Sequence, residues 1–299
     1  MKLKLAALSL AMFATCGAFA QATDTIAKVK ASGLITMGVR DSSGALSYTL
    51  GDSKFAGYHY DVCSRIITSL EKAVGRKVET KLQLVTSQNR IPLVQNGTVD
   101  IECGSTTNNA TRQKDVAFLN TVYMEQVRIA VKAKSGITNI AQLNGKSVAT
   151  TTGTTSVQLL RKNERAANID FKEVFGKDHA DSFLLLESDR AEAFVMDASI
   201  LIGNIVNSKS PSDYKIVGEP LSLEPIGIMI RKDDPAFKKL GNDVIADLVK
   251  SGEIAKIYDK WFVSPIPPKN ISVNMPVTAE TKTAWASLND KPAEDFVKK

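Results

Sequence analysis

Two polar clusters between Ser87 and Arg112 carry the residue types that bind carboxylates. The first cluster ends at Arg90 and the second ends at Arg112. A guanidinium offers a rigid, planar set of donors that matches a carboxylate, and nearby hydroxyls and helix-start N–H groups add further donors. This stretch therefore predicts a site for one or more carboxylates. The alternative is a pair of surface loops with solvated arginines, which the stretch alone does not exclude.

A predicted helix and a predicted strand lie between the two clusters. Ser87 and Asn89 are typical of a helix start, and Gly97 is typical of a helix end. A short strand is predicted at Val99–Ile101, and it leads into a loop rich in hydroxyls and amides over residues 104–109. The chain should therefore fold back, so that both clusters face one region.

Strands and helices alternate through the first part of the chain. Residues 34–40 form a predicted strand that ends at Arg40, and residues 78–85 form another that leads to Ser87. This alternation is typical of a parallel α/β sheet, whose ligands bind beyond the carboxyl ends of the strands. Arg40, Ser87 and Ser105 all follow predicted strands, so they should share one edge of the sheet.

A second series of strands and helices brings three further candidate residues. The predicted strand at residues 147–149 runs into a hydroxyl-rich turn that contains Gly153 and Thr155 and opens a helix. Such a turn suits an anion, although simple helix capping explains it equally well. His179 opens a later helix, where it is either a ligand contact or an ordinary surface residue. Asp197 ends a strand, so it could meet an ammonium group or cap the next helix.

Length and composition favour an exported, two-lobed protein. Residues 1–20 have the charged start, apolar middle and small-residue end of a cleavable signal peptide, and no later stretch is long enough to span a membrane. The remaining residues, roughly 280, exceed what one hydrophobic core usually holds. The formal net charge of +6 is too small and scattered to indicate nucleic-acid binding. The two histidines show no metal-ligand spacing.

Two cysteines, Cys63 and Cys103, remain after the signal peptide. An even number of cysteines in an exported chain suggests one disulfide. The bond would tie the helix after Asp61 to the strand before Ser105. The alternative is a pair of buried free thiols.

Several of these stretches together resemble a known family. The stretches are Thr86–Leu93, Glu102–Asn109, Gly153–Ser156, Lys177–His179, Arg231–Pro235 and Asp259–Phe262, followed by Pro267–Pro268. They are similar to the periplasmic solute-binding proteins of amino-acid ABC transporters, over nearly the whole mature chain. One departure is His59, which stands where the family often carries an acid.

The resemblance implies an α/β fold of the periplasmic binding protein type II class, with two lobes joined by a two-strand hinge. Lobe 1 would contain residues 21–126 and 223–299, including a C-terminal tail, and lobe 2 would contain residues 127–222. The hinge would lie near residues 125–127 and 220–224. Such a protein would work in the periplasm as a monomer without a cofactor. It would close over an amino acid and deliver it to an inner-membrane permease.

The resemblance also implies a ligand, because the likeness is to family members that bind glutamate and aspartate. The residues it carries over fall into three groups, for the α-carboxylate (Arg112, Thr107, Thr155), the α-ammonium (Ser105, Asp197) and the side-chain carboxylate (Arg40, Arg90, Ser87, His179). Three arginines and one aspartate would give this site an excess of positive charge. Such an excess suits a ligand with two carboxylates and one ammonium.

Two other functions are compatible with the same fold. Some relatives, such as the cyclohexadienyl dehydratases, are enzymes and need a general acid in the cleft. Only Asp197 and His179 could supply one here, and the resemblance gives both a binding role. A sensory domain of a receptor usually needs a membrane anchor, and this sequence shows no such stretch.

Overall fold

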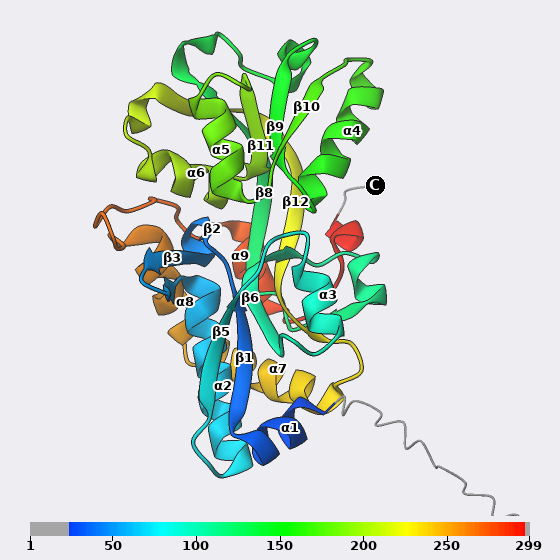
Figure 1. The fold of residues 1–299 in the computed structure, drawn as a ribbon, viewed down its shortest axis with the longest axis vertical. Coiled ribbons are helices and arrows are strands. Elements are labelled where there is room, and N and C mark those ends of the chain that lie inside the picture. Colours follow the sequence, from blue (N-terminus) through cyan, green and yellow to red (C-terminus); the bar gives the residue numbers. More distant parts are fainter. Residues whose placement is uncertain (1–23, 297–299) are drawn as a thin grey trace, which may run out of the picture.

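The computed structural model describes residues 24–296 as two lobes stacked along the long axis of the molecule (Figure 1). The predicted signal peptide lies outside these residues. Two long neighbouring strands, β8 (Tyr123–Lys132) and β12 (Tyr214–Arg231), run from one lobe into the other. The predicted α/β architecture with two lobes and a two-strand connection is confirmed.

One nine-stranded sheet passes through both lobes, because β8 and β12 pair with strands on each side. Its strands follow the order β10-β9-β11-β8-β12-β6-β1-β5, with β7 paired to β12. Besides β8 and β12, these strands are β1 (Leu34–Val39), β5 (Glu79–Leu84), β6 (Ile101–Thr107), β7 (Val116–Phe118), β9 (Ser147–Thr151), β10 (Lys172–Gly176) and β11 (Ala193–Asp197). A small second sheet contains β2 (Ser42–Ser43), β3 (Ser47–Gly51) and β4 (Lys54–Ala56).

Helices cover this sheet in both lobes (Figure 1). They are α1 (Thr25–Ser32), α2 (Tyr58–Val74), α3 (Arg90–Gln95), α4 (Thr155–Ala167), α5 (His179–Glu187), α6 (Ala198–Asn207), α7 (Pro235–Lys250), α8 (Glu253–Tyr258) and α9 (Ala279–Ala286). In α2, buried Val62, Ile66 and Leu70 repeat at the helical period, and Gly75 ends the helix in the left-handed conformation. None of the described helices is long and apolar enough to cross a membrane.

The parallel pairing predicted for the first part of the chain is confirmed for β5, β1 and β6, but the sheet as a whole is mixed. The sheet is parallel only among β5, β1 and β6 in one lobe and among β10, β9 and β11 in the other. β8 runs antiparallel to β11, and β12 runs antiparallel to β6, β7 and β8. β12 is continuous over its whole length, with a register irregularity between Val217 and Ser222.

The loop predicted over residues 104–109 is wrong in its first part. β6 continues to Thr107, and all seven of its residues are buried. Polar residues in this strand pair with β12 through Thr106 and Thr107, so backbone pairing rather than an apolar pattern extends the strand. Ser105 and Thr107 are therefore strand residues.

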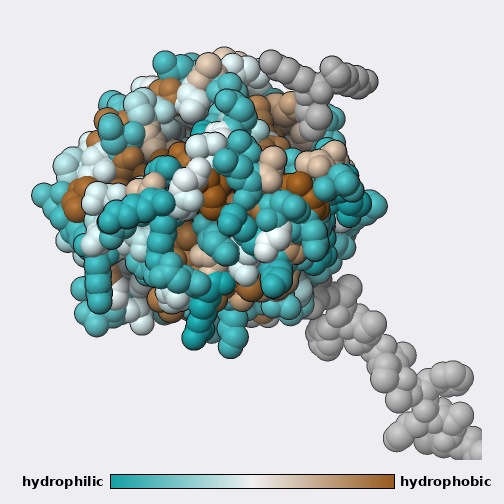
Figure 2. Space-filling view, turned by 90° about the horizontal axis from the view of Figure 1, so that it is seen from above, coloured by the Kyte–Doolittle hydropathy of each residue, from teal (hydrophilic) through white to brown (hydrophobic). Residues whose placement is uncertain are grey.

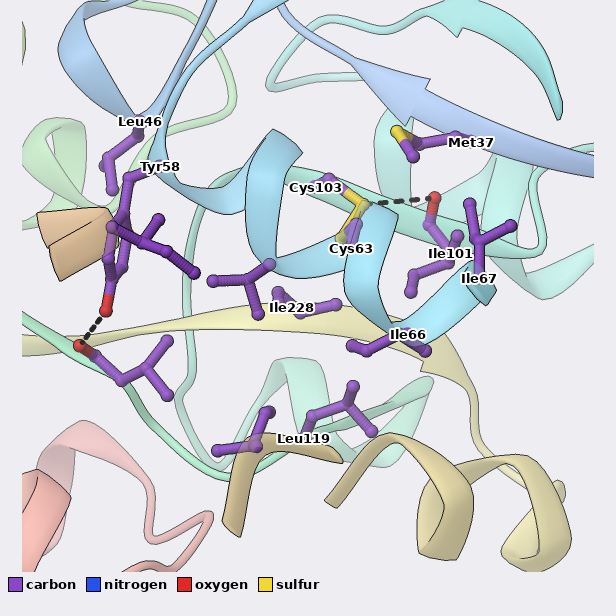
Figure 3. Close-up of a cluster of buried hydrophobic side chains, with 14 of the residues drawn as sticks. Met37, Leu46, Tyr58, Cys63, Ile66, Ile67, Ile101, Cys103, Leu119 and Ile228 are labelled. Carbon is purple, nitrogen blue, oxygen red and sulfur yellow. Dashed lines mark hydrogen bonds between the residues drawn. A yellow bond between two sulfur atoms is a disulfide. The ribbon is translucent and has the colours of Figure 1, made fainter. Parts of the chain in front are cut away.

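Hydrophobic residues form separate cores in the two lobes. The largest cluster draws on residues 29–123 and 226–273, and two others draw on residues 127–217. The predicted disulfide between Cys63 and Cys103 is confirmed, and it joins α2 to β6 inside the largest core (Figure 3). The face seen in Figure 2 is mostly hydrophilic, with scattered hydrophobic spots.

Candidate functional site

All nine predicted site residues lie at the facing edges of the two lobes, and only Thr155 is not fully buried. The first lobe contributes residues that follow or end strands or open helical turns: Arg40 after β1, Ser87 after β5, Arg90 at the start of α3, Ser105 and Thr107 in β6, and Arg112. The second lobe contributes the first residues of α4 and α5 and the last residue of β11, which are Thr155, His179 and Asp197. The ends of strands and the first turns of helices thus place most of the candidates.

Arg40 joins the two lobes through one end of its guanidinium. Its Nη2 donates to Ser87 Oγ at 3.2 Å and to Asp178 Oδ1 at 2.6 Å, and lies 3.1 Å from His179 Nε2. The side chain is fully buried. Its Nε and Nη1 atoms have no hydrogen-bond partner within residues 24–296. Arg40 therefore retains unused donors in a site from which water is excluded.

Arg90 is a buried guanidinium with two nitrogen atoms that lack a hydrogen-bond partner among the described residues. It is 2 % exposed, and its Nε and Nη1 atoms find no partner in the described part of the chain. Burial, and next the guanidinium of Arg112, lower the pKa of Arg90 well below its usual range, against the attraction of Glu102. A buried charge without partners costs several kcal/mol, on the order of 3–5. A buried group with such a strongly perturbed pKa is a candidate for a functional site.

Arg112 and two threonines surround a buried carboxylate. Arg112 donates to the backbone oxygens of Thr107 at 2.8 Å and Gly153 at 3.2 Å. The hydroxyls of Thr107 and Thr155 both donate to Glu224 Oε2, at 2.6 and 2.8 Å. Each hydroxyl has a single proton, so neither can donate to a ligand carboxylate while it holds Glu224.

Asp197 lies among other acids where the sheet crosses between the lobes. Its Oδ1 atom has no hydrogen-bond partner among the residues described. Its backbone pairs with Val127, two residues from Glu125, and Glu125 pairs with Glu224 across β8 and β12. Burial, followed by repulsion from Glu125, raises the pKa of Asp197 well above its usual value. Burial likewise raises the pKa of Glu125 to about 7, although Ser199 donates to its carboxylate.

The expected excess of positive charge is wrong. Beside Asp197, four buried or partly buried acids belong to the same region: Glu102, Glu125, Asp178 and Glu224. The sequence placed Glu125 and Glu224 only in the hinge, and it left Glu102 and Asp178 without a role. An acid within a buried strand was the available signal for Glu102, since strands rarely bury an acid without a partner.

Both histidines of the chain are buried and neutral. His179 Nδ1 lies 3.0 Å from Thr151 Oγ1, and burial together with Arg40 lowers the pKa of His179 to about 3. The surface alternative for His179 is therefore wrong. His59 Nδ1 lies 2.7 Å from the Gly104 oxygen and donates to it, and burial lowers the pKa of His59 to about 4. His59 thus supports β6 beside the site.

The two lobes touch across the site. A Cβ atom added to Gly153 would lie 2.8 Å from Gln88 Cα in the opposite lobe. One added to Gly44 would lie 2.5 Å from the oxygen of Ser199, again across the lobes. Within the first lobe, Ser105 Oγ lies 2.9 Å from Ser43 Oγ, which is within hydrogen-bond distance. Among residues 24–296 no group of three or more side chains could hold a metal ion.

Comparisons with known proteins place the chain in a family. Residues 35–264 match the family model of bacterial extracellular solute-binding proteins, family 3. The chain is 42 % identical over 299 residues to the glutamate/aspartate import solute-binding protein of Escherichia coli, covering 97 % of this chain and 99 % of that one. It is 45 % identical over 277 residues to the L-glutamate/L-aspartate-binding protein of Pseudomonas aeruginosa, covering 92 % and 91 %.

Solved structures show the same fold. An arginine-binding protein variant from T. maritima has a TM-score of 0.70 at 26 % identity, covering 79 % of this chain and 98 % of that chain. A cysteine-binding protein from Campylobacter jejuni has a TM-score of 0.72 at 21 % identity, covering 86 % and 98 %. At this low identity, the second likeness concerns the fold alone.

Proposed function

This chain belongs to the bacterial extracellular solute-binding proteins of family 3, and we propose from that premise that it captures glutamate or aspartate between its lobes for import. Like its relatives, it is a transport binding protein and not an enzyme. The loaded, closed form would dock on an ABC permease of the inner membrane. It would do so as a monomer, and it needs no cofactor for this role.

The observation that carries the proposal is the buried Arg90 guanidinium with two unused donors. A second carboxylate on the ligand would supply its missing partner. Arg40, Ser87 and His179 adjoin the same region through the contacts of Arg40. These four residues are proposed to bind the side-chain carboxylate of the amino acid. Glutamine, which lacks that charge, would leave the guanidinium unmatched.

The α-amino-acid end would lie toward Arg112 and Asp197. Arg112 and the start of α4 at Thr155 are proposed to bind the α-carboxylate, and Asp197 with Ser105 the α-ammonium. The unpaired Asp197 Oδ1 supports this assignment, because an ammonium group offers it a donor. Thr107 has its hydroxyl on Glu224, so it would contribute only if that hydroxyl turned toward the ligand.

Closure requires two moving lobes and a hinge. We propose that residues 21–126 and 223–299 form one lobe and 127–222 the other, with the hinge in the β8–β12 pair near residues 125–127 and 220–224. The separate hydrophobic cores support this division. A ligand that touches both lobes only in the closed form would shift the population toward it. Residues 1–20 would direct the protein to the periplasm as a cleaved signal peptide.

A binding panel on stripped protein tests the proposed ligand. Tightly bound amino acids often copurify, so the protein is first unfolded with its disulfide intact, dialysed and refolded. Isothermal titration calorimetry with glutamate, aspartate, glutamine, asparagine and arginine then ranks the ligands. Glutamate or aspartate should bind most tightly. Equal affinity for glutamine and glutamate would show that the acidic-ligand assignment is wrong.

A further inference from the structure

Helix α5 is capped by a residue from the opposite lobe. Asp178 occupies the N-cap position of α5, yet its carboxylate accepts no hydrogen bond from its own helix. The cap is instead Ser42 Oγ, which accepts from the backbone N–H of Ala180 at 3.1 Å. Ser42 lies in β2 of the other lobe.

The Asp178 carboxylate accepts hydrogen bonds from the opposite lobe. Its Oδ1 accepts from Arg40 Nη2 at 2.6 Å, and its Oδ2 accepts from Ser42 Oγ at 2.9 Å. Burial raises the pKa of Asp178, but the attraction of Arg40 and the hydrogen bonds from Arg40 and Ser42 outweigh burial and lower it overall. The charge of Asp178 is therefore stabilised by partners in the closed form.

The same groups have a second way to satisfy their hydrogen bonds. An N-cap aspartate normally accepts from backbone N–H groups in the first turn of its own helix. When the lobes part, Ser42 and Arg40 move away from α5, and Asp178 can rotate to cap the helix itself. The cap of α5 would thus be exchanged between the two lobes on closing, with few hydrogen bonds lost in either form.

We infer that Asp178 and Ser42 form a latch that is made only when the lobes close, and that Asp178 positions the Arg40 guanidinium for the ligand. This inference rests on the proposed function, since it assigns closure to ligand capture. Asp178 engages Nη2 of Arg40 and leaves Nε and Nη1 for an anion, because neither has a partner within the described residues. Asp178 also balances the charge of Arg40. Binding of the side-chain carboxylate of the ligand therefore depends chiefly on the charge of Arg90.

The latch makes two variants informative. Ser42→Ala removes the cross-lobe cap and one hydrogen bond to Asp178. Asp178→Asn removes the charge that holds Arg40 but keeps a good N-cap for the open form. Asp181→Asn is the matched control, because Asp181 is an exposed acid in the first turn of the same helix.

Stopped-flow and calorimetric measurements with L-glutamate and L-aspartate test the latch. Ser42→Ala should weaken both ligands by roughly fivefold to thirtyfold, and Asp178→Asn by roughly tenfold to 150-fold, mainly through faster dissociation. The loss should be equal for the two ligands, since the latch touches neither. The double variant should lose less than the product of the single losses. Asp181→Asn should stay within about twofold of the wild type, because exposed charges contribute little.

Melting of the ligand-free protein separates a latch from a structural role. The midpoints of Ser42→Ala and Asp178→Asn should stay within about 1 °C of the wild type, because the open form lacks the latch. Wild-type affinity in both variants, or a fall in the ligand-free midpoint that explains the binding loss, would overturn the inference. Failure of the proposed function is a separate result. If neither glutamate nor aspartate binds the wild type, the affinities of the variants relative to the wild type are measured with the amino acid that most stabilises the wild-type protein. Those ratios then test the latch independently of the proposed ligand.

Discussion

Replacing Arg90 with alanine is the most direct perturbation of the site. The guanidinium is 2 % exposed and has two donors without a partner in residues 24–296, so a bound carboxylate would be its main partner. Removing one member of a buried charge pair usually costs roughly 2–5 kcal/mol of binding free energy. The affinity for glutamate should therefore fall by roughly 30-fold to a few thousand-fold. Glutamine affinity should fall much less, because glutamine brings no second charge.

The stability of the ligand-free protein should move in the opposite direction. Truncating a large buried side chain normally destabilises the fold by roughly 2–5 kcal/mol. Arg90 differs because its burial leaves donors unpaired, each of which costs roughly 1–3 kcal/mol in the closed form. Water reaches the guanidinium when the lobes open, which reduces this cost. Arg90→Ala should thus leave the free energy of unfolding unchanged or slightly raised.

Calorimetry with glutamate and glutamine, together with urea unfolding of stripped protein, measures both effects. Arg65→Ala serves as the control, since the Arg65 side chain is 56 % exposed and makes only a long ion pair of 3.6 Å with Glu253. The control should bind as the wild type does. Loss of unfolding free energy in Arg90→Ala without selective loss of glutamate binding would refute the reasoning, because Arg90 would then be a structural residue.

Three further predictions concern closure, protonation and the disulfide. Gly153→Ala should weaken ligand binding at least tenfold, because its Cβ would meet Gln88 Cα at 2.8 Å on closing. Gly145→Ala shares a positive φ but meets no atom within 4 Å, so in the same calorimetric titration it should bind normally. The raised pKa of Glu125, about 7, implies stability that is present below the unfolded pKa near 4.5 and is lost as pH rises to 7. In urea unfolding between pH 4.5 and 8, the unfolding free energy of Glu125→Gln relative to the wild type should thus rise with pH by up to roughly 3 kcal/mol. Replacing Cys63 and Cys103 with serine should lower the unfolding free energy by an amount on the order of 4 kcal/mol, given a 40-residue loop. Unchanged urea midpoints would contradict that estimate.

Local signals predicted most of the elements that position the site. The helix signals around Arg90 and Gly97 match α3, and the strand ending at Arg40 matches β1. These signals act over a few residues, so they do not depend on the rest of the fold. The junctions between strands and helices were therefore predictable, and so was the gathering of Arg40 and Ser87 at one edge.

Long-range pairing set the features that local signals missed. β6 extends to Thr107 because β12 supplies hydrogen-bond partners from more than a hundred residues away. β12 likewise continues through Pro225 because it pairs with β8 there, whereas Pro220 lies in the register irregularity between Val217 and Ser222. Local propensity disfavours proline within a strand, so the tertiary contacts override it here.

The buried acids require a different view of how this site selects an anion. Three arginines and five acids surround the cleft, and two of the acids, Glu125 and Asp197, have raised pKa values. Even with those two acids protonated, three acids remain against three arginines, so the total charge does not favour an anionic ligand. The positions of the charges select the ligand instead, because the arginines lie where the ligand carboxylates are proposed to bind. Glu125, Asp197 and Glu224 lie on neighbouring strands near the proposed ammonium site. Burial raises the pKa of Glu125 and of Asp197, which favours a proton on this acid cluster before the ligand arrives. An ammonium group at Asp197 would replace that proton, so the acids would favour a zwitterion over a simple dicarboxylate that fits the arginines equally well.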